Sequence, residues 1–158
     1  IVHALITSRL DNLNSLLHKL PAYDLDRLQK VQNNSARLIH RQPRENNITP
    51  TLKELHWLPI PSRIEYKILL LTYKSLNNLA PSYLSSLIQP YVPPRPLRSA
   101  SKKLLCEHSS AKKYGERAFK NSTSTLWKRL PLDIKTSESV NIFKNKLKTH
   151  LFRIAYGE

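Results

Sequence analysis

Few side chains in this 158-residue sequence are spaced so that they can perform chemistry together. Asp24 and Asp26 form an Asp-x-Asp pair. On a helix, two such residues project about 200° apart, so they cannot share a metal ion or a proton. We interpret them as carboxylates near a helix start, where they face the positive end of the helix dipole. Catalysis by two metal ions needs several converging carboxylates, and no such set is present.

Histidine and cysteine give an equally weak signal for a metal site. Cys106, Glu107 and His108 lie together, whereas a structural zinc site usually needs two close pairs of ligands. We therefore expect no catalytic residue, no metal ligand and no bound cofactor in this chain, and we interpret Cys106 as a buried cysteine in a short strand. The remaining histidines are scattered: His3, His18, His40, His56 and His150.

Composition excludes several classes of protein. The chain has only two glycines, so neither common glycine-rich phosphate loop can form, and an all-β fold with many tight turns is disfavoured. A single cysteine excludes a disulfide framework and indicates a reducing compartment. We find no run of about 18 apolar residues and no signal segment. We expect an intracellular protein of the cytoplasm and nucleus that is neither secreted nor bound to a membrane.

Positive charge is the strongest chemical signal. The chain has 26 Lys and Arg against 11 Asp and Glu, a formal net charge of +15. Residues 1–79 hold 11 basic and 6 acidic side chains, and residues 80–158 hold 15 and 5, so most of the excess lies in the C-terminal half. An excess of this size predicts attraction to a polyanion such as nucleic acid. A basic surface that serves only solubility is the plainer alternative.

The spacing of apolar residues predicts a mainly helical protein. Steps of three and four predict helices over 2–20, 24–41 and 139–155, with the first two antiparallel across Pro21. Residues 62–79 are apolar on nearly all sides, which predicts a buried central helix, with Ser62 and Glu65 as a capping box. Shorter helices are expected at 49–56, 81–88 and 122–130. A short strand at 103–106 is expected to pair with 117–119.

We therefore expect an irregular multi-helix bundle with a Pro-rich extended segment and at most a short β-hairpin. Four segments are predicted along the chain. They are a helical hairpin (1–44), an apolar helical core (45–88), a basic Pro-rich extended segment (89–121), and C-terminal helices that pack on the core (122–158).

Two groups of cations are candidate nucleic-acid-binding residues. On the helix over 24–41, the basic residues lie within an arc of about 80°, apart from a predicted apolar stripe at Leu25, Leu28, Val31, Ser35 and Leu38. Tyr91 and Tyr114 lie among the second group and are either base-stacking residues or solvated turn tyrosines. The candidates are Arg27, Lys30, Arg37 and Arg41 on the helix, and Arg95, Arg98, Lys102, Lys103, Lys112 and Lys113 in the extended segment.

Eight stretches occur in an order that resembles one family. They are ITSRLDNLNSLL (6–17), LQKVQNNSARLI (28–39), LHWLPI (55–60), RIEYKIL (63–69), LAPSYL (79–84), YGERAF (114–119), LWKRLP (126–131) and FKNKLKTHLF (143–152). Together they resemble the region after the polymerase palm in LINE-type (non-LTR) retrotransposon reverse transcriptases of the chicken-repeat and Rex-like clades. Asn12 and Leu13 depart from the pattern, since tyrosine and cysteine are common there, which fits a diverged copy.

The resemblance implies a thumb over residues 1 to about 44, followed by the C-terminal region of the enzyme. The family performs RNA-templated DNA synthesis with catalytic aspartates and Mg ions in an upstream palm. This chain has no Asp-Asp. It starts at Ile1 and has no methionine, so we expect a piece of a longer polypeptide that is not itself an enzyme. The implied partners are RNA, DNA (template–primer and target) and the palm of the same polypeptide. The alternative is a protein-interaction scaffold or host-encoded remnant without a nucleic-acid role.

Overall fold

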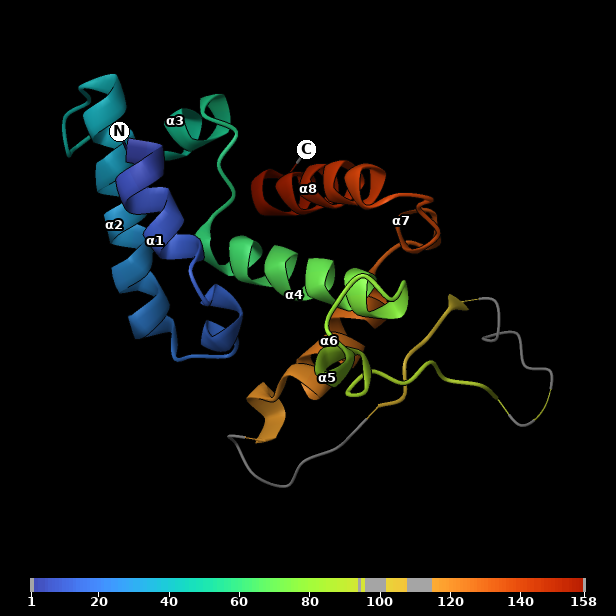
Figure 1. Ribbon diagram of the computed structural model, residues 1–158. Helices are drawn as coiled ribbons and strands as arrows, with labels where there is room; N and C mark the ends of the chain where they lie inside the picture. Colours follow the sequence, from blue (N-terminus) through green and yellow to red (C-terminus); the bar gives the residue numbers. More distant parts are fainter. Residues whose placement is uncertain (1, 94, 96–101, 108–114, 158) are drawn as a thin grey trace. The chain divides into compact units, whose positions relative to one another are not determined.

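The computed structural model describes residues 2–93, 95, 102–107 and 115–157 (Figure 1). Within them the protein is mainly α-helical, as predicted. The chain forms two compact units: unit 1 comprises residues 1–64 and 148–158, and unit 2 comprises residues 65–147. Helices α4 (Ile60–Leu76) and α8 (Val140–Tyr156) each contribute residues to both units.

The N-terminal part of unit 1 is not the single helix predicted over 2–20. It consists of a π-helical turn η1 (His3–Thr7), the short helix α1 (Ser8–Asp11) and a 3₁₀ turn η2 (Asn14–Leu17). The chain breaks at Leu13, whose φ is 52°. The Asn14 amide donates a hydrogen bond to the Asp11 carboxylate at 3.3 Å. Short polar side chains of this kind compete with helical backbone bonding, which explains why the apolar period did not sustain a helix.

Helix α2 (Ala22–His40) lies close to its predicted bounds, but its buried side is rotated away from the predicted stripe. Val31 and Leu38 are 45% and 69% exposed, whereas Gln32 and Ala36 are buried. The Gln32 amide donates to the carbonyl oxygen of Leu58 at 2.8 Å, so a polar side chain occupies the interior. Figure 1 shows α1 and α2 running in opposite directions, and η1 contacts α2.

Helix α4 follows the short helix α3 (Thr49–Glu54) and begins two residues earlier than predicted. Pro61 lies inside its first turn, where a missing N–H is tolerated, so the predicted Ser62–Glu65 capping box is wrong. The N–H of Ile60 instead donates to the side chain of Gln29 at 2.8 Å. No side chain from 62 to 76 is exposed, which confirms the predicted burial over that stretch, but the helix ends three residues earlier than predicted and Leu79 is 57% exposed.

The core of unit 2 is a set of stacked aromatic rings. The rings of Tyr73 and Phe143 stack at 4.1 Å between centroids, and Trp127 lies 6.2 Å from Phe143. The Tyr73 hydroxyl donates to the carbonyl oxygen of Ser137 at 2.6 Å. The rings come from α4, α6 (Phe119–Arg129) and α8, and the connections include α5 (Ser82–Ser85), η4 (Gly115–Arg117) and α7 (Leu132–Lys135).

The predicted strand around 103–106 is present only as one antiparallel bridge, between Pro90 and Leu105. The N–H of Tyr91 donates to the carbonyl oxygen of Leu104 at 2.9 Å, and the N–H of Cys106 donates to that of Gln89 at 2.8 Å. The predicted pairing with 117–119 is wrong, because η4 and the first turn of α6 occupy those residues. Cys106 is partly exposed rather than buried.

Helix α8 confirms its predicted bounds to within a residue, and the hydroxyl of Ser139 accepts the N–H of Ile142 at 3.3 Å. Phe143, Leu147 and Leu151 are buried as predicted, but Ile154 is 66% exposed. Among the described residues, six that are not glycine adopt left-handed backbone: Leu13, Lys19, Arg41, His56, Asn78 and Lys103.

Candidate nucleic-acid interface

The cations of α2 occupy its outer face. Arg27, Lys30 and Arg41 are exposed, and no described carboxylate forms an ion pair with them. Arg37 is half-buried and donates to the carbonyl oxygen of Asn46 at 3.4 Å, so it is less available than predicted. Arg41 ends the helix in left-handed backbone, with its N–H bonded to the carbonyl oxygen of Arg37.

The outer face of α2 also carries an aromatic ring that the sequence analysis missed. Tyr23 is 71% exposed, and the Arg27 guanidinium carbon lies 5.9 Å from the centre of its ring. The spacing of Tyr23 and Arg27 could have indicated this contact, because residues four apart on a helix are neighbours. This face therefore combines cations with an exposed ring and the exposed side chains of Val31 and Leu38.

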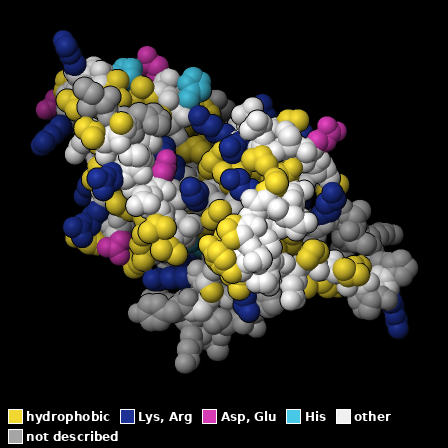
Figure 2. Space-filling view, in the orientation of Figure 1, with side chains coloured by type: hydrophobic (Ala, Val, Ile, Leu, Met, Phe, Trp, Pro, Cys, Tyr) yellow, Lys and Arg dark blue, Asp and Glu magenta, His cyan; other side chains and the backbone are white. Residues whose placement is uncertain are grey.

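The second predicted group is only partly described. Arg95, Lys102 and Lys103 are exposed, whereas Arg98, Lys112 and Lys113 lie outside the described residues, as does Tyr114. Figure 2 shows dark blue Lys and Arg side chains far more often than magenta Asp and Glu side chains on the visible face. Positive charge therefore dominates that surface of the described chain.

The fold places two further lysines beside Lys102 and Lys103. Lys128 on α6 forms an ion pair with Glu107 at 2.7 Å. Lys135, the last residue of α7, is only 7% exposed, and its ammonium donates to the carbonyl oxygen of Lys102 at 3.3 Å. Burial, reinforced by the charge of Lys102, lowers the pKa of Lys135. Sequence reasoning missed Lys135, because nothing in the local pattern shows its burial.

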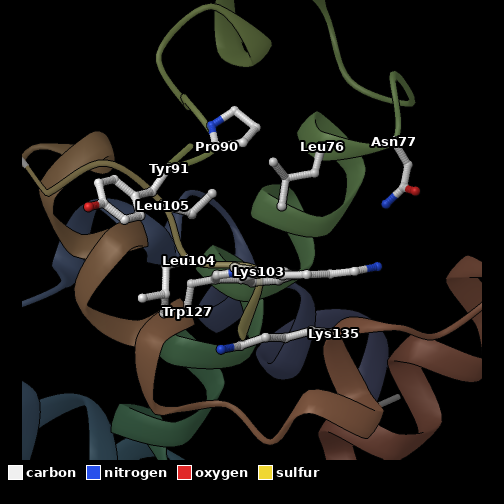
Figure 3. Close-up of a pocket in the computed structure, with 9 residues that line it drawn as sticks. All are labelled: Leu76, Asn77, Pro90, Tyr91, Lys103, Leu104, Leu105, Trp127 and Lys135. Carbon is white, nitrogen blue, oxygen red and sulfur yellow. The ribbon is translucent and has the colours of Figure 1, made fainter. Parts of the chain in front are cut away.

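Two of these lysines, Lys103 and Lys135, border a pocket of about 360 Å³ in unit 2 (Figure 3). Lys103 and Lys135 lie on one side of it, and Tyr91 and Trp127 also line it. The Trp127 indole donates to the carbonyl oxygen of Lys103 at 2.9 Å. A second hollow of about 510 Å³ is lined by Lys102, Leu104, Lys128, Leu130, Leu132 and Lys135, so Lys135 borders both.

Acidic side chains contribute little to either site. Burial raises the pKa of the Glu65 carboxyl, and the charge of Arg129 partly offsets this.

The described residues contain no group of three or more His, Cys, Asp or Glu arranged to hold a metal ion. None of the described helices is both long enough and apolar enough to span a bilayer.

Comparison with known proteins gave no match to a family model, a curated protein or a solved structure. The resemblance to non-LTR reverse transcriptases therefore stays a prediction from the sequence. What the structure contributes independently is an exposed cationic helix face and a lysine-bordered pocket.

Proposed function

We propose that this chain is a non-catalytic, nucleic-acid-binding part of a non-LTR retrotransposon reverse transcriptase, comprising its thumb and C-terminal region. It binds template–primer or element RNA through phosphate contacts. The observation that carries the proposal is the outer face of α2, where Arg27, Lys30 and Arg41 are exposed and unpaired by any described carboxylate. The eight stretches of sequence that occur in the family's order support the assignment to this family.

The spacing of these three cations suits a phosphate backbone. Fourteen residues separate Arg27 from Arg41, a rise of about 21 Å along the helix axis. Phosphates follow one another about every 3.4 Å of axis along one strand of a duplex, so three cations over this length can each meet a different phosphate. Such contacts position a duplex without reading its sequence.

In this proposal, catalysis belongs to the palm of the same parent polypeptide, which would hold the Mg ions, and this chain is not itself an enzyme. An Asp-Asp pair is absent from the sequence. The partners are RNA, template–primer duplex and target DNA. These partners place the parent protein in the cytoplasm and the nucleus.

The test is the salt dependence of binding to a labelled RNA–DNA hybrid duplex. Each phosphate neutralised contributes about 0.9 to the slope of log affinity against log salt. The triple variant Arg27→Gln/Lys30→Gln/Arg41→Gln is expected to lower that slope by about 2 to 3 and to weaken binding to all sequences alike. A matched control, Lys120→Gln/Lys148→Gln/Arg153→Gln, removes the same charge from exposed residues of α6 and α8. A wild-type slope near zero, or equal losses in both triple variants, would refute the proposal.

A role as a protein-interaction scaffold is the second candidate, and the apolar part of the same helix face favours it. Tyr23 and Leu38 are about 70% exposed, at 71% and 69%. Apolar side chains that gather on one surface commonly mark a protein contact. This role predicts self-association that Leu38→Glu abolishes in sedimentation velocity. A monomer at all concentrations would weigh against this second role.

A further inference from the structure

Within the described part of the chain, the Lys135 ammonium has fewer partners than a buried charge requires. It has three N–H donors, and among the described residues it donates to one neutral carbonyl, that of Lys102, at the long distance of 3.3 Å. Only 7% of the residue is exposed, so water cannot fully replace the missing acceptors. The carboxylate of Glu107 is engaged by Lys128 at 2.7 Å. An anion from outside the chain would complete the site.

The loop that carries Lys102 and Lys103 is held in place beside this ammonium. Two successive carbonyl groups are bonded, that of Lys102 by the Lys135 ammonium and that of Lys103 by the Trp127 indole. Trp127 is itself buried, at 2% exposed. The backbone that carries the two lysines is therefore held in place before a ligand arrives, which lowers the entropic cost of binding.

The rest of the pocket suits a flat, partly apolar group. In Figure 3, Pro90, Tyr91 and Leu105 lie on one side, Leu76 and Asn77 lie on the other, and Lys103 and Lys135 lie below them. Tyr91 is 40% exposed, so its ring is accessible to a stacking partner. A volume of about 360 Å³ lies within the usual range of about 300–1,000 Å³ for small-ligand pockets.

We propose that this pocket holds one nucleotide of a single-stranded nucleic acid, with its phosphate on the Lys135 ammonium and its base against Tyr91. Lys103, which also lines the pocket, adds positive charge around the phosphate. That the nucleotide belongs to a nucleic-acid strand rests on the proposed function. The chemistry of the nucleotide itself, an anion joined to a planar ring, follows from the pocket.

The experiment uses Trp127 as a reporter. The chain has two tryptophans, so the variant Trp57→Phe leaves Trp127 alone at the pocket. UMP, AMP, uridine and inorganic phosphate are titrated against its fluorescence, and a hexamer of uridylate is titrated in parallel. We expect the mononucleotides to change the fluorescence, and uridine to bind about tenfold more weakly because it lacks the charge-assisted contact.

Two variants probe the two halves of the pocket. In the same background, Lys135→Met and Tyr91→Ala are each expected to weaken UMP binding about tenfold, the size of one charge-assisted or stacking contact. Lys148→Met and Tyr83→Ala are matched controls, because both replace exposed residues that do not line the pocket. Lys103→Gln is a third probe, because the Lys103 side chain lines the pocket and the substitution keeps the Lys103 carbonyl that the Trp127 indole binds. It is expected to weaken UMP binding as well, which tests the phosphate contact independently of Lys135→Met.

The outcomes separate this inference from the proposed function. If the hybrid duplex and the hexamer bind but UMP does not, or if Tyr91→Ala and Lys103→Gln bind UMP as the controls do, the pocket assignment is wrong and the proposed function stands. If UMP binds in the predicted pattern while duplex and hexamer do not, the proposed function fails and the pocket is a mononucleotide site. Equal binding of uridine and UMP would overturn the phosphate assignment.

Discussion

The side-chain oxygen of Gln29, in the middle of α2, accepts a hydrogen bond from the N–H of Ile60, the first residue of α4, at 2.8 Å. A helix start is usually capped by the residue directly before it, but here that residue is Pro59, which has no side-chain acceptor. The Gln29 amide in turn donates to the side chains of Gln32 and Asn33, at 3.0 and 2.8 Å. One glutamine therefore fixes where α4 begins within unit 1.

Replacing this cap is expected to destabilise the fold. Gln29→Ala should lower the free energy of unfolding by about 1–2 kcal/mol, because it leaves a helix-start N–H without its acceptor. Urea denaturation measures the change. Ser62→Ala is the matched control, since the local sequence suggested Ser62 as the cap and the structure does not use it. A larger loss from Ser62→Ala than from Gln29→Ala would contradict this account of the helix start.

The ion pair between Asp11 and Arg63 is expected to stabilise unit 1. The Arg63 guanidinium contacts both oxygens of the carboxylate, with Nε to Oδ1 at 2.9 Å, and the Arg63 side chain is only 14% exposed. Asp11→Asn should cost about 1 kcal/mol in low salt and less in 1 M salt, because the Asp11 side chain is partly solvated.

The exposed pair of Lys128 and Glu107 provides the comparison for that measurement. Both of its side chains are more than half exposed, so Glu107→Gln is expected to change the unfolding midpoint little. If the two substitutions had equal effects, burial of the Arg63 guanidinium would not be what gives the first pair its strength.

Because of the Tyr156 hydroxyl, we expect the fold to lose stability in alkali. Its hydroxyl donates to the carbonyl oxygen of Trp57 at 2.6 Å, and burial raises its pKa to about 12, from an ordinary value of 10.0. A raised pKa in the folded state means that stability is fully present below pH 10 and is lost as the pH rises toward 12. Thermal melts from pH 9 to 12 should show a steeper decline for the wild type than for Tyr156→Phe. Parallel declines would show that other groups cause the alkaline loss.

For Lys135 we expect the opposite trend, in which its contribution to the free energy of unfolding improves as the pH rises. Its pKa is lowered from an ordinary value of 10.5, so the cost of burying its charge is present at neutral pH and is lost as the pH rises toward 10.5. Lys135→Met should therefore raise the free energy of unfolding at pH 7, with a smaller gain at pH 10. Chemical denaturation at the two pH values measures both. A lower stability at pH 7 would show that the ammonium stabilises the fold.

The sequence predicted the helices whose apolar residues repeat without interruption. The bounds of α2 and α8 lie within two residues of prediction, because the period of an amphipathic helix is a local property. The failures occur where contacts between distant residues decide the outcome. Gln32 is buried because it donates to Leu58, 26 residues away, and α4 begins early because Gln29 accepts from Ile60, 31 residues away.

The residues of the candidate site also divide into those that the sequence predicts and those that it does not. The exposure of Arg27, Lys30 and Arg41 follows from the helical arc, which is visible in the sequence. The burial of Lys135 and its bond to Lys102 depend on how α7 lies against a loop 33 residues earlier, and composition carries no trace of that. The cations of the helix face and Lys103 of the pocket were therefore predictable, whereas Lys135 was not.

The left-handed residues described above, six within the described part of the chain, have a consequence for how the protein tolerates mutation. Each side chain held at positive φ disfavours the native state by about 1–2 kcal/mol relative to ordinary backbone. Their sum is comparable to the whole stability of an ordinary domain, about 5–15 kcal/mol. Replacing one of them by glycine, at exposed Lys19 for instance, relieves that penalty, whereas asparagine at position 78 already adopts this conformation readily. These positions are thus natural sites for suppressor mutations that rescue a damaged core elsewhere in the chain.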